Sequence, residues 1–185
     1  MEFYLKYDGP LKGNDDPVGK HCLRRVFYSQ FKKLWSIMPL CERKAHLLSV
    51  ASSGKSILKD IEGLIFAPLV TTRLSLTCEL DITLLWPEEA GNIVKNSGDI
   101  DNRLKTLFDA LACPDANQVK TILKNNDINQ MPQPFFCLLE DDKLITSVKV
   151  RTATLLTTPS KDKDVSVLIE VRTKRHRSCW ANEGL

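Results

Sequence analysis

Alternation of apolar and polar residues is clearest between Thr71 and Trp86. A period of two is typical of a strand with one face buried and the other exposed. Leu64–Val70 is a nearly continuous apolar run and indicates a buried strand. Weaker alternation predicts further strands at Glu2–Tyr7, Leu144–Thr157 and Val165–Thr173. Phe135–Leu139 is a further apolar run that leads into an acidic group.

Apolar residues recur at three- and four-residue spacing in two other regions, which predicts amphipathic helices. The first region is Lys20–Ile37, and a shorter helix is expected at Cys41–Val50. The second main helix is expected at Asp101–Ala112, with a core stripe of Leu104, Leu107, Phe108 and Leu111.

These elements predict a mixed α+β fold with one small sheet of about four to five strands and two main helices. The length of 185 residues fits one domain, residues 1–185. Within it we expect an N-terminal helical elaboration (about 20–60), an insertion (about 112–139) and a basic C-terminal tail (174–185). The insertion is polar and rich in Asn and Gln, and a single helical turn is expected at Gln118–Leu123.

Composition narrows the function only a little. The 26 Lys and Arg exceed the 23 Asp and Glu by three, a weakly basic balance that is compatible with a nucleic-acid partner. The six cysteines contain no CxxC pair, which favours reduced thiols in a cytoplasmic protein. No apolar stretch approaches the length of a membrane span, and the N-terminus lacks a signal-peptide pattern, so no membrane partner is expected.

The segment Gly98–Lys105 concentrates the candidate chemistry. Asp99 and Asp101 alternate just before the second main helix, and Lys105 follows one helical turn later. Glu140–Asp142 provides a second acidic group. Carboxylates gathered from separate parts of a chain hold hard divalent cations, and a nearby lysine suits a phosphate group.

Simpler roles remain open for each of these residues taken singly. An Asp near a helix start commonly caps the helix. Asp101 and Lys105 are spaced for an ion pair along one helix flank, and Glu140–Asp142 alone fits a solvated turn. The combination is harder to explain in this way, because a cap needs one carboxylate and the segment offers two.

This arrangement resembles the RusA family of Holliday-junction resolvases. The family signature is Asp-x-Asp-Asn-x-x-Lys, followed by a Phe-Asp-Ala-Leu-like helix and a later Asp-Asp before a strand. The resemblance spans about Thr71 to Val171, and the matching residues are Asp99, Asp101, Asn102, Lys105, Phe108, Asp109, Ala110, Leu111, Asp141 and Asp142.

The resemblance implies a Mg²⁺-dependent endodeoxyribonuclease, with Mn²⁺ as a substitute, that hydrolyses phosphodiesters in branched or structured DNA as a homodimer. It implies that Asp99, Asp101 and Asp142 bind the metal and are needed for cleavage, with Asp141 as a secondary ligand and Lys105 as a further essential group. The chain departs from the family pattern in its N-terminal helical region and in its long insertion. Nuclease chemistry is therefore better supported than the choice of a four-way junction.

Basic residues in two clusters and one loop are the candidate phosphate contacts, although solvated charged faces of this kind are common. These candidates are Lys12, Lys20, Arg24, Arg25, Arg172, Lys174 and Arg175.

Two other functions fit the same residues. The first is a catalytically weak or inactive nucleic-acid-binding or scaffold protein with the same fold. The second is a nuclease that acts on RNA or on a defence-related substrate.

Overall fold

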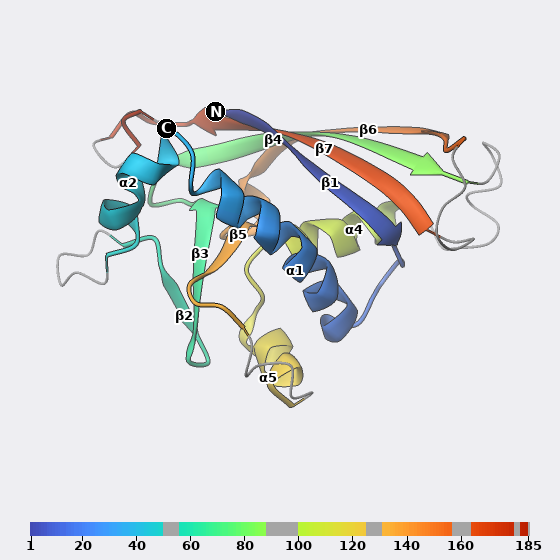
Figure 1. Cartoon of the computed structure of the whole chain (residues 1–185), viewed down its shortest axis with the longest axis horizontal. Helices are drawn as coiled ribbons and strands as arrows, with labels where there is room; N and C mark the ends of the chain where they lie inside the picture. The colour runs from blue at the N-terminus through green and yellow to red at the C-terminus, as the bar shows by residue number, and fades with distance from the viewer. Residues whose placement is uncertain (50–55, 88–99, 125–130, 157–163, 180–181, 185) are drawn as a thin grey trace.

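A computed structural model describes residues 1–49, 56–87, 100–124, 131–156, 164–179 and 182–184. Figure 1 shows the arrangement of its helices and strands. In chain order the elements are β1 (Glu2–Pro10), α1 (Pro17–Leu34), α2 (Leu40–Leu47), β2 (Lys59–Ile61), β3 (Leu64–Val70), β4 (Leu76–Trp86), α4 (Ile100–Leu111), α5 (Ala116–Lys124), β5 (Phe135–Leu139), the 3₁₀ helix η2 (Asp142–Leu144), β6 (Ile145–Thr154) and β7 (Asp164–Arg175).

The strands form two mixed sheets, and the predicted α+β class is confirmed. A four-stranded sheet has the order β1-β7-β4-β6, with β4 and β6 parallel and the other neighbours antiparallel. A three-stranded sheet has the order β2-β3-β5, with the β2–β3 hairpin antiparallel and β3 parallel to β5. The sequence pattern predicted one sheet; the structure adds a second.

Helices α1 and α4 cover one face of the four-stranded sheet, while the smaller sheet and α5 extend away from it (Figure 1). The alternation along β4 places its apolar residues against these helices, and all six of its inward positions are buried. Helix α1 contributes Phe27, Phe31 and Leu34 to the same core, with Trp35 directly after it. Helix α4, which carries the candidate motif, therefore packs beside α1 on the inner face of this sheet (Figure 1).

The outer face of the four-stranded sheet carries alternating charges in ion pairs. The central carboxylate is Asp81 of β4, whose side chain is only 12% exposed and contacts two cations from β6. The pairs on this face are Lys6–Asp8, Lys149–Asp81, Arg151–Asp81, Arg172–Glu2, Arg172–Glu170 and Lys174–Glu79.

The two edges of the four-stranded sheet differ. At the β1 edge, the Gln30 side chain of α1 accepts a hydrogen bond from the Lys6 N–H (2.9 Å) and donates one to the Lys6 carbonyl (2.7 Å). At the other edge, β6 has eight exposed residues of ten. The β1 edge is thus capped at Lys6 by a side chain, whereas most residues of β6 are exposed among the described residues.

Several element boundaries differ from the sequence prediction for local reasons. Helix α1 begins earlier than predicted, because Asp16 accepts a hydrogen bond from the Gly19 N–H and Pro17 occupies the first turn. Strand β4 begins later, since the Thr71 carbonyl accepts a hydrogen bond from the Leu76 N–H and closes a turn. Helix α5 is longer than the single turn expected. No helix in the described part of the chain has the length and apolar character to cross a membrane.

Candidate active site

Helix α4 carries most of the candidate motif. It begins at Ile100, directly after Asp99, which lies outside the described residues. The predicted apolar stripe is confirmed. Leu107 and Leu111 are fully buried, and the partly buried Leu104 and Phe108 pack against the same core.

Asp101, Lys105 and Asp109 follow each other at four-residue spacing and therefore share one flank of α4. The Asp101 and Lys105 residues are exposed. Both are described, and their side chains form no ion pair with each other. The simple explanation of these two residues as a helix-stabilising ion pair is therefore not supported.

The loop after β1 fixes the first turns of α4. The Asn14 N–H donates to the Asn102 carbonyl (3.4 Å), and the Asp15 N–H donates to the Thr106 Oγ1 (3.2 Å). Lys12 belongs to the same loop and is exposed. A cavity of about 450 Å³ opens beside it, lined among others by Lys12, Asp15, Asp16, Cys22 and Thr106. The predicted phosphate contact at Lys12 thus lies beside the motif helix.

Arg103 holds the start of α4 against the end of β4. Its guanidinium lies 4.3 Å from the centre of the Trp86 ring, and the residue is only 3% exposed. Sequence reasoning missed this residue, which fills an unspecified position of the motif. The available signal was its spacing of four from Leu107, which places Arg103 on the buried side of the helix.

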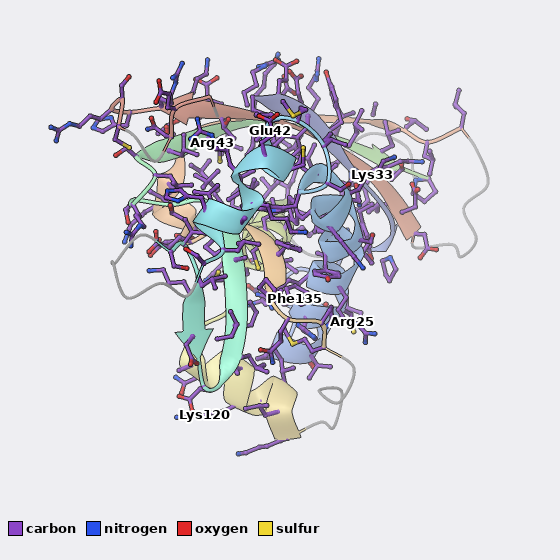
Figure 2. The ribbon with its side chains drawn as sticks, turned by 60° about the vertical axis from the view of Figure 1, so that its left-hand side comes forward. Arg25, Lys33, Glu42, Arg43, Lys120 and Phe135 are labelled. Carbon is purple, nitrogen blue, oxygen red and sulfur yellow. The ribbon has the colours of Figure 1, made fainter. Side chains whose placement is uncertain are left out.

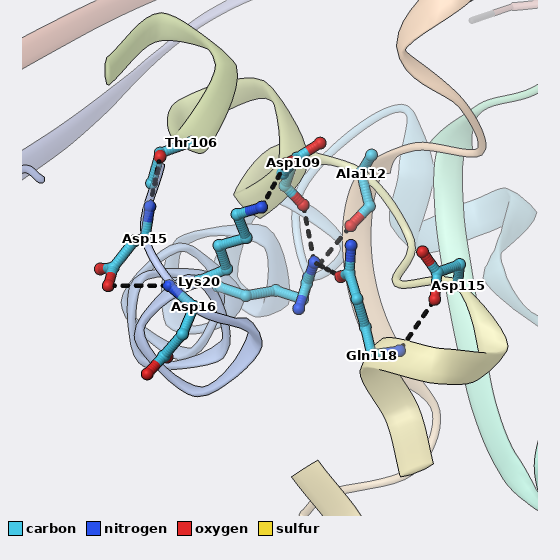
Figure 3. Close-up of polar contacts among 9 residues, drawn as sticks. Asp15, Asp16, Lys20, Thr106, Asp109, Ala112, Asp115 and Gln118 are labelled. Atoms are coloured by element: carbon cyan, nitrogen blue, oxygen red, sulfur yellow. Dashed lines mark hydrogen bonds and ion pairs between the residues drawn. The ribbon is translucent and has the colours of Figure 1, made fainter. Parts of the chain in front are cut away.

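The last turn of α4 is held by two basic residues of α1 (Figure 3). The Lys20 Nζ lies 2.7 Å from the Asp109 carboxylate. The Arg24 guanidinium donates to the Asp109 carbonyl (2.6 Å), the Ala112 carbonyl (3.0 Å) and the Gln118 side chain (3.3 Å). These bonds satisfy carbonyls that a helix end leaves without partners.

Arg24 corrects one prediction. We expected Arg24 to contact phosphate, but the residue is only 1% exposed. Its hydrogen bonds go to backbone carbonyls at the C-terminal end of α4 and to the Gln118 side chain near the start of α5. Burial lowers the pKa of its guanidinium from the ordinary value, and nearby Cys137, Cys113 and Asp109 act in the opposite direction. Arg24 is a structural residue of this fold.

The second acidic group follows β5. Asp141 caps η2, because its carboxylate accepts a hydrogen bond from the Lys143 N–H (3.0 Å); this bond, outweighing partial burial, lowers the Asp141 pKa. Asp142 is exposed. A cavity of about 470 Å³ brings this pair together with the end of α4, and its acidic lining residues are Asp109, Asp115, Glu140, Asp141 and Asp142.

The expected metal ligands do not form a complete group among the described residues. Asp142 shares a cavity with Asp109, and Asp109 lies eight residues, or about 12 Å along the helix, from Asp101. Within the described ranges no cluster of three or more His, Cys, Asp or Glu is arranged to hold a metal ion. The oxygen donors suit Mg²⁺ or Mn²⁺ by their chemistry, and the third expected ligand, Asp99, lies outside these ranges.

The remaining candidate phosphate contacts divide into two environments. Arg25 is exposed on α1. Arg172 and Lys174 lie on the outer sheet face, where both are engaged by carboxylates, and Glu170 and Glu2 hold the Arg172 pKa above its ordinary value despite desolvation. Arg175 is exposed at the end of β7.

No protein-family model, curated protein or solved structure matches the chain.

Proposed function

We propose that the protein is a Mg²⁺-dependent endonuclease, similar to the RusA family, that hydrolyses phosphodiesters in branched or otherwise structured DNA. The observation that carries the proposal is the exposed flank of α4, on which Asp101 and Lys105 lie one turn apart without pairing to each other. An exposed carboxylate and lysine that do not neutralise one another remain available to a cation and a phosphate.

The proposed roles follow the family pattern. Asp99, Asp101 and Asp142 would hold Mg²⁺, with Asp141 as a further ligand, and the bound ion would lower the pKa of a water molecule and polarise the scissile phosphate. Lys105 balances the negative charge that develops on the phosphoryl oxygens as the bond breaks. The contacts of Arg103 with Trp86 and of Asn14 with Asn102 fix the helix turn that carries these groups.

Cleavage of a labelled four-way junction by the purified protein in Mg²⁺ tests the proposal, with a linear duplex and a structured RNA as parallel substrates. We expect junction cleavage, and a loss of about 100-fold in Lys105→Ala, the size typical for one charge-stabilising group. Asp101→Asn should lose at least as much. Asp8→Asn, an exposed carboxylate on the outer sheet face, is the matched control and should cleave normally. A wild type that leaves all three substrates uncut, or an Asp101→Asn variant with wild-type rate, would contradict the proposal.

A nucleic-acid-binding protein without turnover is the second candidate. The distance between two expected metal ligands favours this second candidate. Asp142 lines the same cavity as Asp109, which lies at the opposite end of α4 from Asp101. A thermal melt with Mg²⁺ or Mn²⁺ separates the two functions. The nuclease proposal expects metal to raise the melting temperature of the wild type and not of Asp99→Ala. No shift in either protein would favour the binding function.

A further inference from the structure

Positive charge is concentrated in one stretch of the chain. Residues 17–59 contain nine Lys and Arg against a single acidic residue, Glu42, a net charge of +8. The rest of the chain contains 17 Lys and Arg against 22 Asp and Glu, a net charge of −5. The overall charge of +3 therefore conceals a strong asymmetry.

This stretch includes α1 and α2, and its cations are exposed at three positions of α1 and half-buried on α2. Arg25, Lys32 and Lys33 are exposed, and α1 has no Asp or Glu along its length. Figure 2 shows Arg25 and Lys33 on α1, with Arg43 and Glu42 on the neighbouring helix α2. We call Arg25, Lys32, Lys33 and Arg43 the α1–α2 basic face.

Two residues of the α1–α2 basic face, Lys32 and Lys33, differ from the cations of the outer sheet face in their contacts with carboxylates. On the outer sheet face, cations such as Lys149 and Lys174 already contact carboxylates. Lys32 and Lys33 contact no carboxylate in the described part of the chain. Binding of a polyanion gains free energy from release of the polyanion's counterions by protein cations. Cations without an ion pair inside the protein provide this gain without first breaking such a pair.

We propose that the α1–α2 basic face binds the phosphate backbone of a nucleic acid. Arg25 and Lys32 are seven residues apart, about 10 Å along the helix, which corresponds to about three nucleotide steps of one strand. Helix α1 packs against α4 and is joined to it through Lys20 and Asp109. A backbone bound along α1 would therefore run beside the motif helix.

The occupant is a nucleic acid rather than a lipid surface for a structural reason. Helix α1 buries its apolar side, including Phe27 and Phe31, in the core. On this helix, all of which is described, Val26 is the exposed large apolar residue, and Ile37 and Met38 are exposed in the connection to α2. Helix α1 itself therefore offers charge with little apolar area for insertion between lipids, and the vesicle competition below tests whether the connection supplies it. The proposal deepens the proposed function by locating the substrate backbone, but binding does not require cleavage.

Fluorescence anisotropy of a labelled DNA duplex, in EDTA so that metal-dependent cleavage is absent, tests the proposal. The test variant is Lys32→Ala/Lys33→Ala, and the matched control is Lys6→Ala/Lys149→Ala, which removes two ion-paired cations from the outer sheet face. We expect the test variant to bind about tenfold more weakly or worse near 0.1 M salt, and its slope of log affinity against log salt to shrink by about two. The control should change by less than about twofold.

Equal losses in the two double variants would show a net-charge effect and overturn the proposal, as would unchanged binding by the test variant. Competition by phosphatidylserine vesicles that is stronger than competition by unlabelled duplex would assign the face to a membrane and also overturn it. A Lys32→Arg/Lys33→Arg variant should restore binding, which excludes misfolding as the cause of a loss. Loss of cleavage with retained binding would count against the proposed nuclease and leave this inference standing.

Discussion

Glu140 shows how one carboxylate can be fixed by partners from distant segments. Its carboxylate accepts hydrogen bonds from the Thr72 N–H (2.9 Å) and hydroxyl (3.0 Å), and pairs with Lys59. Partial burial acts to raise the pKa of Glu140, but the hydrogen bonds from Lys59 and Thr72 outweigh it and the pKa lies below its ordinary value of 4.5. Glu140 therefore links the start of β2 and the end of β3 to the end of β5.

This lowered pKa predicts a pH-dependent contribution to stability. A group whose pKa falls on folding stabilises the protein above its unfolded pKa and loses that effect as the pH falls through the folded pKa. We expect Glu140→Gln to lower the free energy of unfolding by about 1 kcal/mol at neutral pH, since the carboxylate is partly exposed. The difference should shrink below pH 4.5, as measured by urea unfolding at several pH values. A difference that grows on acidification would contradict the assignment.

Single-residue environments were only partly predictable from the sequence. Arg24 and Arg25 are adjacent and chemically identical in the sequence, yet one is 1% exposed and the other is exposed. The difference arises because the folded chain determines which side of α1 faces the core, and consecutive helix residues point in different directions. Lys12 stays a predicted phosphate contact; the structure places its loop against α4 through the backbones of Asn14 and Asp15.

At the scale of elements, α4 is anchored at both ends by different chemistry. Its first turns are held by the loop after β1 and by Arg103 on Trp86. Its last turn is held by Arg24, whose charge also complements the negative end of the helix dipole. The two anchors come from segments that precede α4 in the sequence.

The Arg24 anchor predicts a large difference between neighbouring residues. Arg24→Met should lower the free energy of unfolding by about 3 kcal/mol, because it leaves buried carbonyls without donors. Arg25→Met should change it by about 0.5 kcal/mol or less, as is usual at surface positions. Chemical denaturation of the two variants measures both values. Similar destabilisation by the two substitutions would be inconsistent with the buried role of Arg24.

Periodicity identified the long elements well and the short ones poorly. The main helices and the strand β4 span several repeats of their periods, so the sequence predicted both helices to within three residues and the end of β4 correctly, although it placed the start of β4 five residues too early. Strand β2 has three residues, too few to show any alternation, and the sequence pattern did not predict it.

At the scale of the whole molecule, the pairing of strands was beyond the reach of the local pattern. Strand β6 follows β5 in the chain but pairs with β4, while β5 joins β3 in the smaller sheet. This crossover brings Asp141 and Asp142 to the end of α4 and into the cavity with Asp109. The motif residues and their helix follow from the local pattern, but the sheet order decides which of these residues are neighbours.

The fold also predicts which thiols react. All six cysteines are free, as the sequence predicted, and Cys22 and Cys41 are exposed. Cys78 is buried, which raises its pKa to about 12, and a hydrogen bond with Cys137 together with burial raises the pKa of Cys113. We expect Ellman's reagent to modify Cys22 and Cys41 first in the native protein and all six thiols in guanidinium chloride. Fewer than six thiols in denatured, unreduced protein would reveal a disulfide and contradict the structure.

The hydrogen bonds between Gln30 and the backbone of Lys6 have a consequence for self-association. A side-chain amide presents the same donor and acceptor as a peptide group, so Gln30 occupies the place that a neighbouring strand would take beside β1. At the opposite edge, eight of the ten residues of β6 are exposed in the described part of the chain. The two edges of the four-stranded sheet should therefore differ in strand addition. Gln30 obstructs pairing of another strand along β1, so we expect a strand from another chain to pair along β6.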